Sequence, residues 1–213
     1  MSKIFILSLF VIICFGRIVS LDAGIVLDWA KVSKVVNKNS QEESTLIGKI
    51  TINSSNVHFR VVQAEDNFYF LSHDEDGNDS AKGSIFLDYR NDVWDEKLLI
   101  YGHNSEIWED APFHFLEYYL NNEYANTHRY LLFEGDHFSF WYELFTVMVV
   151  TSDYHHINLK FDDNTYYEHL LWLQQQSRID IPLVLREHDS ILLMQTCYYD
   201  PKPSYLVLGF RKR

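Results

Sequence analysis

Two short stretches of the sequence each place a chemically capable side chain at the end of an apolar run. The run in "LLIYGHNSEIW" (98–108) leads into Gly102 and His103, and the run in "ILLMQTCYYD" (191–200) ends at Cys197. A thiolate is a strong nucleophile, and a nearby imidazole raises the thiolate fraction and later protonates a leaving amine. If both runs are strands whose ends meet, His103 and Cys197 form a site for acyl transfer. The plainer alternative for Cys197 is a small buried hydrophobe.

The elements that would hold such a pair are mostly strands. The chain has 213 residues, with 14 Tyr and 15 Phe against only 8 Gly and 4 Pro, which is typical of a globular domain rich in β structure. We expect about eight strands, the number that fills a small closed barrel with side chains. They are 46–52, 57–63, 84–88, 97–101, two strands around the "GD" turn in 128–150, 191–196 and 204–210.

Three further segments favour helices. Residues 22 to about 40 carry apolar side chains at helical spacing, which predicts an amphipathic N-terminal helix. "APFHFLEYYL" (111–120) is a second helix, which Asp110 can cap. A third helix, "YYEHLLWLQQQ" (166–176), follows a capping box of Thr165 and Glu168 and lies in the long connection before the Cys197 strand.

The N-terminus predicts export. Lys3 precedes thirteen uncharged residues, 4–16, which is the pattern of a secretory signal or, extended to Leu21, of an uncleaved anchor. We therefore expect residues 1–21 to be a signal or membrane-anchor segment and residues 22–213 to be an extracellular catalytic domain.

Composition argues against several other partners. The formal net charge is −12 and no Lys/Arg stripe is present, so a nucleic-acid partner is not expected. The acidic run "HDEDGNDS" (73–80) fails as a calcium loop, because the places for Gly and Glu hold Asp79 and Ile85. We expect no metal and no cofactor. The two cysteines, Cys14 and Cys197, give no disulfide framework, so Cys197 is expected to be a free thiol.

The motifs around both stretches resemble those of class B sortases. "DNFYFLSHDEDGNDSAKGSIFLDYRND" (66–92), "LLIYGHN" (98–104) and "LLMQTC" (192–197) are similar to family motifs in the same order. The similarity extends over roughly 22–210 and includes the helix before the Cys197 strand. It implies a mainly β fold, an eight-stranded sortase-type barrel with an N-terminal helix and a helix inserted before the Cys strand.

The resemblance also implies an activity, which is transpeptidation on the outer face of a Gram-positive cell, at the cell membrane. Cys197 would attack a C-terminal sorting motif of a secreted protein, with His103 as general acid/base. An amine of a peptidoglycan precursor or a pilin lysine would then resolve the thioacyl enzyme. Thr196 would help to position the acyl oxygen. The N-terminal segment would be the single membrane anchor.

One family feature is missing from the sequence. Class B sortases have an arginine at the start of the strand after the Cys, and the matching run "SYLVLG" places Ser204 there, or Tyr205 after a slip of one residue. A hydroxyl donates one hydrogen bond, but unlike the guanidinium of arginine it carries no positive charge and cannot donate two parallel hydrogen bonds. Arg186, in the connection before the Cys strand, is the candidate replacement. The gap leaves open an alternative, a sortase-like protein that binds sorting peptides or pilus components without turnover. A second alternative is a thiol hydrolase, in which water resolves the acyl-enzyme.

Overall fold

The computed structural model describes residues 45–53, 55, 57–105, 110–151, 154–199 and 202–213, and strands at 12–14, 17–19 and 26–28. The chain divides into two compact units, Met1–Glu42 and Glu43–Arg213.

In the first unit, three short strands form an antiparallel sheet in the order β1 (Ile12–Cys14), β2 (Arg17–Val19) and β3 (Val26–Asp28). The helix expected over 22–40 is therefore wrong at Val26–Asp28, because pairing with β2 engages the backbone groups that a helix would need. The rest of 22–40 lies outside the described residues. Among the described helices, none is long and apolar enough to cross a membrane.

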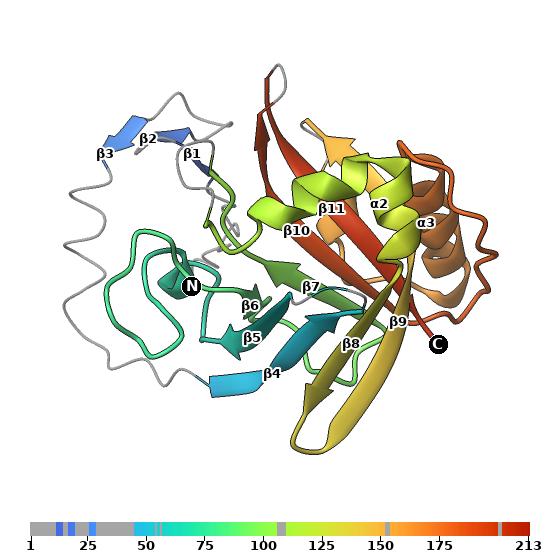
Figure 1. The fold of residues 1–213 in the computed structure, drawn as a ribbon, viewed down its shortest axis with the longest axis horizontal. Coiled ribbons are helices and arrows are strands. Elements are labelled where there is room, and N and C mark those ends of the chain that lie inside the picture. Colours follow the sequence, from blue (N-terminus) through green and yellow to red (C-terminus); the bar gives the residue numbers. More distant parts are fainter. Residues whose placement is uncertain are drawn as a thin grey trace, which may run out of the picture. The chain divides into compact units, whose positions relative to one another are not determined.

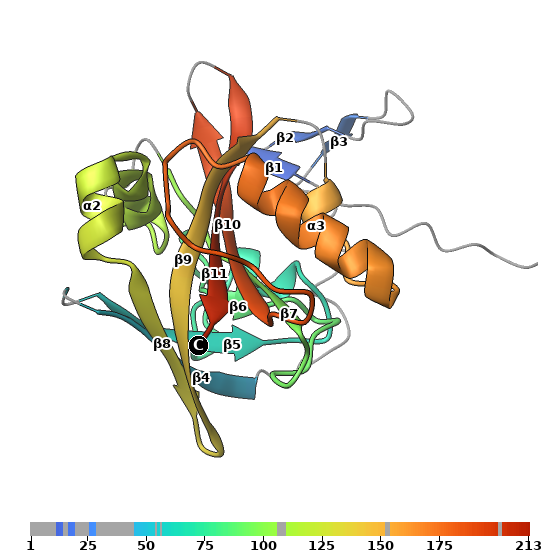
Figure 2. The same ribbon diagram turned by 90° about the vertical axis from the view of Figure 1, so that its right-hand side faces the viewer.

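The second unit is built on a closed eight-stranded barrel, which confirms the fold expected from the strand pattern (Figures 1 and 2). Around the barrel the order is β10-β11-β9-β8-β4-β5-β6-β7. Two neighbouring pairs are parallel, β5 with β6 and β7 with β10, and the other pairs are antiparallel. The strands are β4 (Thr45–Ile52), β5 (His58–Gln63), β6 (Phe86–Leu87), β7 (Lys97–Tyr101), β8 (Tyr130–Gly135), β9 (Phe138–Val150), β10 (Ile191–Tyr199) and β11 (Pro203–Lys212).

Alternating side chains of these strands fill the barrel. On β10, Leu192 and Met194 belong to the core, and on β11 Leu206 and Leu208 do. Successive residues of a strand point to opposite faces, so Gln195 and Cys197 lie on the outer face of β10. This alternation decides below which side chains share a face with the cysteine.

The segment expected as a helix over 111–120 is a 3₁₀-helix, η2 (His114–Leu120), followed by the α-helix α2 (Asn122–Thr127). Asp110 does not cap it: the residue before η2 is Phe113, which offers no side-chain cap, and Asp110 instead pairs with Lys82. Leu116 and Tyr119 are buried in the core, and this packing fixes η2 against the end of the barrel.

The connection between β9 and β10 holds two helices, η3 (His155–Ile157) and α3 (Asp163–Gln175). Figure 2 shows α3 beside the barrel, where Leu173 O accepts a 2.8 Å hydrogen bond from the β9 residue Thr146. The expected helix is confirmed, but its capping box lies one turn earlier. Asp162 is the N-cap, and it exchanges hydrogen bonds with Thr165.

A buried lysine fastens this connection to β7. Lys97 Nζ donates to the carbonyl oxygens of His156 (2.7 Å) and Asn158 (2.6 Å) and lies 2.8 Å from His169 Nε2. Burial holds the pKa of Lys97 well below its usual range, and burial, then the nearby Lys97, lowers the pKa of His169 to about 2. The same connection reaches β10, because His156 Nε2 lies 2.6 Å from Gln195 Oε1.

Candidate active site

The parallel pairing of β7 and β10 joins the two segments of the chain that carry His103 and Cys197. Tyr101 is paired with Gln195, and Gly102 N donates to Gln195 O at 3.3 Å. Two residues beyond this pair, His103 follows the end of β7 and Cys197 lies in the last part of β10. The sequence separation of 94 residues is thus closed by one parallel strand pair.

Gly102 is required where β7 ends. A Cβ at this position would lie 2.8 Å from the ring of Phe113 and 3.2 Å from Ile85. The chain can therefore turn out of the sheet here only without a side chain. Phe113 N then donates to His103 O at 2.8 Å, which holds the turn.

The imidazole of His103 is held by the loop before β6. His103 Nε2 lies 2.8 Å from the carbonyl oxygen of Leu71, in the 3₁₀-helix η1 (Tyr69–Leu71). A carbonyl only accepts, so Nε2 carries the proton and Nδ1 of the neutral ring keeps its lone pair. Burial lowers the pKa of His103, and the bond to Leu71 opposes this only in part. The ring is therefore neutral near pH 7 and able to accept a proton from a thiol at Nδ1.

Gly83 also packs closely against this ring. It has φ +59°, and a Cβ there would lie 3.0 Å from His103 Cδ2 and 2.4 Å from Phe70 O. The left-handed backbone and the close approach both call for glycine. The position of His103 thus depends on two backbone groups, those of Leu71 and Gly83.

Cys197 is a half-buried cysteine on the outer face of β10. Thr196, the residue before it, points the other way, toward the core, and is 2% exposed. Its hydroxyl donates to Gly102 O at 2.8 Å. The structure therefore places Thr196 as a link between the ends of β7 and β10, on the opposite face from the thiol.

On β11 the structure distinguishes between the two candidates for the arginine place. Ser204 shares the inner face with Leu206, and its hydroxyl donates to Tyr198 O at 3.2 Å. Tyr205 is paired directly with Cys197, on the same outer face. Tyr205 is buried and its ring lies 5.9 Å from that of Tyr154. Of the two, the residue beside the thiol is Tyr205.

The structure does not bring Arg186 to this site. Its side chain is exposed, and its backbone N–H donates to Asp189 just before β10 begins at Ile191. Cys197 lies six residues along the strand, about 20 Å away at 3.3 Å per residue. Arg186 is therefore at the opposite end of β10 from the thiol.

Asn104 is a site residue that the analysis of the sequence passed over. Its side-chain amide donates to the carbonyl oxygen of Cys197 at 3.1 Å, and it is only 7% exposed. The available signal was its place directly after His103 in "YGHN". Its partner, the Cys197 carbonyl, could not be read from the sequence.

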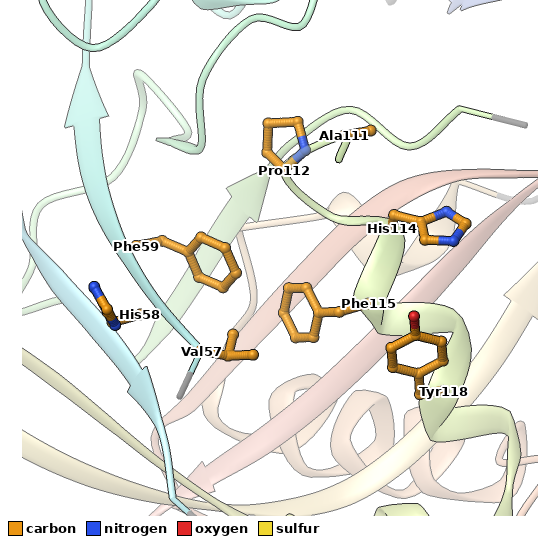
Figure 3. Close-up of a pocket in the computed structure, with 8 residues that line it drawn as sticks. All are labelled: Val57, His58, Phe59, Ala111, Pro112, His114, Phe115 and Tyr118. Atoms are coloured by element: carbon orange, nitrogen blue, oxygen red, sulfur yellow. The ribbon is translucent and has the colours of Figure 1, made fainter. Parts of the chain in front are cut away.

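A pocket of about 280 Å³ opens at the same end of the barrel (Figure 3). β5 runs antiparallel to β7, so its start lies where β7 ends. Phe59 and Phe115 stack at 5.0 Å in this pocket, and Tyr118 and His114 of η2 complete one wall.

No metal centre emerges from the part of the chain that the structure describes: no group of three or more His, Cys, Asp or Glu side chains there could hold an ion. In the acidic turn, Asp74 accepts hydrogen bonds from the backbone N–H groups of Asp76 (3.0 Å) and Asn78 (2.8 Å). Hydrogen bonds from Asn78 hold the pKa of Asp74 below its usual value.

Comparison with known proteins agrees with this fold. Sortase B of Listeria monocytogenes is 30% identical over 155 residues, which are 71% of this chain and 62% of that protein. An X-ray structure of Clostridium perfringens sortase B has a TM-score of 0.71 at 25% identity, covering 86% of this chain and 99% of that one. A Staphylococcus aureus sortase B–substrate complex shares the fold, with a TM-score of 0.71 at 23% identity over 86% and 83% of the two chains.

No protein-family model matches the chain. The chain spans less than two thirds of the curated relatives it matches, 62% and 63% of their lengths. With the closed barrel and its strand order, the matches nevertheless show that the chain belongs to the class B sortases.

Proposed function

We propose that this protein is a cysteine transpeptidase. It cleaves a C-terminal sorting motif of secreted proteins and transfers the acyl group of the cleaved protein to an amine. The observation that carries the proposal is the pairing of β7 with β10, because His103 and Cys197 each lie two residues beyond the paired residues Tyr101 and Gln195. The amine belongs to a peptidoglycan precursor or to a pilin lysine. Sorting-motif proteins and this amine are the proposed partners.

The proposed reaction has two halves. His103 Nδ1 takes the proton of Cys197, and the thiolate attacks the scissile carbonyl carbon to form a tetrahedral intermediate. The C–N bond then breaks, His103 returns the proton to the leaving amine, and a thioester to Cys197 remains. In the second half the incoming amine attacks this thioester, its proton passes to His103, and the thiol is released with the new amide formed.

The lowered pKa of His103 supports its proposed role as the group that accepts the thiol proton. A neutral imidazole is the form that accepts a thiol proton, and burial keeps His103 neutral near pH 7. The hydrogen bond to Leu71 O occupies Nε2, so that Nδ1 is the atom left to exchange protons. One nitrogen therefore serves as base in each attack and as acid in each departure.

Tyr205 is the proposed substitute for the missing arginine. It is the β11 residue opposite Cys197 on the outer face, and its phenol is a hydrogen-bond donor for the acyl oxygen. A neutral donor stabilises a developing oxyanion less than a guanidinium, and loss of an oxyanion donor typically costs about 100- to 1,000-fold in rate. A slower enzyme than an arginine-bearing sortase is expected.

The same substitution favours a second candidate function. A protein with a serine and a tyrosine at the start of β11 could bind sorting peptides or pilus components without turning them over. Under this alternative Cys197 would still react with small thiol reagents but would not form an acyl adduct with a peptide. A thiol hydrolase differs in that water, not an amine, resolves the adduct.

For localisation we propose the outer face of the cell membrane. Residues 1–21 would be the signal or anchor segment and 22–213 the extracellular catalytic domain. The run 4–16 without charge supports this proposal.

The test is an acyl-enzyme trap. The full-length chain is incubated with a mixture of candidate sorting-motif peptides and analysed by intact-protein mass spectrometry. We expect an adduct that Cys197→Ala abolishes and that Cys14→Ala, the matched cysteine control, retains. Adding an amine should convert the adduct to an amide product, which separates transpeptidase from hydrolase. An adduct that survives Cys197→Ala refutes the nucleophile, and alkylation without any adduct supports the binding protein.

A further inference from the structure

The carboxamide of Asn104 is the most fully engaged side chain near the thiol. Nδ2 donates to Cys197 O at 3.1 Å and to Glu117 Oε1 at 2.5 Å. Oδ1 accepts from Ser105 N at 2.8 Å and lies 3.0 Å from His114 Nδ1. Two donors and two acceptor positions are the full capacity of an amide, so each of them is used in a nearly buried site.

The orientation of this amide is fixed by partners of single polarity. The backbone N–H of Ser105 only donates, so the atom facing it is the oxygen. A glutamate carboxylate only accepts when ionised, so the atom facing Glu117 is the nitrogen. A flipped amide would oppose both partners, and the group that reaches Cys197 O is therefore a donor.

The register explains why Cys197 O needs a side-chain donor. Gly102 N donates to Gln195 O, and a β7 that continued straight would next bring the N–H of residue 104 to the carbonyl of residue 197. β7 instead ends at Tyr101 and the chain turns away. Asn104 Nδ2 supplies the hydrogen bond that its own backbone would have made.

We propose that Asn104 is a positioning residue for the nucleophile: its amide replaces the missing backbone donor of β7 and fixes the Cys197 backbone while His103 turns out of the sheet. The role follows from a conflict between two requirements. His103 must leave the ladder to bring its ring to Leu71, yet the end of β10 needs a partner to stay rigid. Asn104 satisfies both. The catalytic meaning of this role rests on the function proposed above.

The donor is anchored through η2. Glu117 and His114 lie on this 3₁₀-helix, whose Leu116 and Tyr119 are buried in the barrel core. Figure 3 shows His114 on the wall of the pocket, one residue before Phe115. An element packed into the core thus holds the amide that donates to Cys197 O, as a positioning group requires.

The test compares four proteins: wild type, Asn104→Ala, Glu117→Gln, and the double variant Asn104→Asp/Glu117→Gln. Glu117→Gln is the matched control, because its side-chain oxygen still accepts from Asn104. The double variant restores the bond between positions 104 and 117 with its polarity reversed and keeps the net charge of the pair. It leaves Cys197 O facing a carboxylate oxygen, so it repairs the scaffold without repairing the bond to the cysteine.

The first readout is alkylation of Cys197 by iodoacetamide from pH 5 to 9 in the full-length chain, quantified on the Cys197 peptide with the Cys14 peptide as internal reference. Asn104→Ala should raise the pH midpoint of Cys197 alkylation and slow alkylation at pH 7 by about tenfold or more. The reason is that a displacement of reacting groups near 1 Å can lower a reaction rate by ~100-fold. The double variant should be equally slow although its urea midpoint matches that of Glu117→Gln. A rate within about twofold of wild type in Asn104→Ala, or full recovery in the double variant, overturns the inference.

The second readout is acyl transfer to peptide, where kcat should fall and KM should stay nearly constant. Alkylation needs no sorting peptide, so the two proposals can fail separately. If wild type forms no acyl adduct but Asn104→Ala still changes the Cys197 alkylation profile, the proposed function fails and the positioning role stands. If adducts form but Asn104→Ala changes neither readout, the positioning role fails alone.

Discussion

Replacing Gly83 by alanine should both destabilise the barrel and slow the chemistry. Gly83 has φ +59°, where a residue with a Cβ costs about 1–2 kcal/mol. The new Cβ would also lie 2.4 Å from Phe70 O, against 3.4 Å or more for an ordinary contact, so the loop must shift by about 1 Å. Overpacking of this kind adds roughly 1–3 kcal/mol, which gives a total loss of about 2–5 kcal/mol in the free energy of unfolding.

The same shift reaches the active site. The Cβ would lie 3.0 Å from His103 Cδ2, so the relieving movement displaces the imidazole or the Leu71 carbonyl that orients it. A misplacement near 1 Å costs on the order of 100-fold in rate, which we expect in kcat for acyl transfer. The assays are urea unfolding and the rate of acyl-enzyme formation.

Gly77→Ala is the matched control for this prediction. Gly77 also has positive φ, +83°, but its Cβ would meet only the hydroxyl of Tyr69, at 3.2 Å. Gly77→Ala should lower the free energy of unfolding by about 1–2 kcal/mol, the cost of a Cβ at positive φ, and should retain full activity. If Gly83→Ala is no less stable than Gly77→Ala and keeps wild-type kcat, then Gly83 does not support His103 and the reasoning is refuted.

Three further changes probe other parts of the structure. Burial lowers the pKa of His169 to about 2, whereas the unfolded chain binds this proton near pH 6.5, so the free energy of unfolding should fall with acidification below about 6.5, by up to ~1.4 kcal/mol per pH unit for this group. In urea titrations at pH 7, 6 and 5, His169→Gln should show a shallower pH slope, and an unchanged slope would contradict the assignment. Thr196→Val should cost about 1–3 kcal/mol, because it leaves Gly102 O without the buried hydroxyl, while Thr196→Ser should retain most of the stability; equal urea midpoints would argue against this link. Arg186→Ala should leave acyl transfer within about twofold of wild type, since Arg186 is exposed at the far end of β10; a large loss in rate would restore it as the missing cation.

The sequence by itself predicted the strands of the barrel, which the structure confirms, and it led us to propose His103 and Cys197 as the reactive residues. The strands are runs of apolar, β-branched and aromatic residues between turn signals, and several, such as β7 and β11, are buried on both faces, so these runs sufficed to predict all eight strands. Helix ends were less well predicted. The capping box expected at Thr165 and Glu168 lies one turn earlier, at Asp162 and Thr165, because Asp and Thr are both favourable N-cap residues. The helix expected over 22–40 failed at Val26–Asp28, where pairing with β2 prevails over helical periodicity.

Only the tertiary structure decided how the site is assembled. That His103 and Cys197 follow two paired residues, Tyr101 and Gln195, results from the parallel register of β7 and β10, which local sequence does not encode. The choice between Ser204 and Tyr205 followed from one register pair, because a shift of one residue exchanges the faces of a strand. His103 Nε2 donates to the carbonyl oxygen of Leu71, and Asn104 Nδ2 donates to that of Cys197. Because every residue has a backbone carbonyl, the sequence does not show which one will be the acceptor. Residue types therefore revealed which side chains could react, and the long-range pairing of the chain determined which of them are held together.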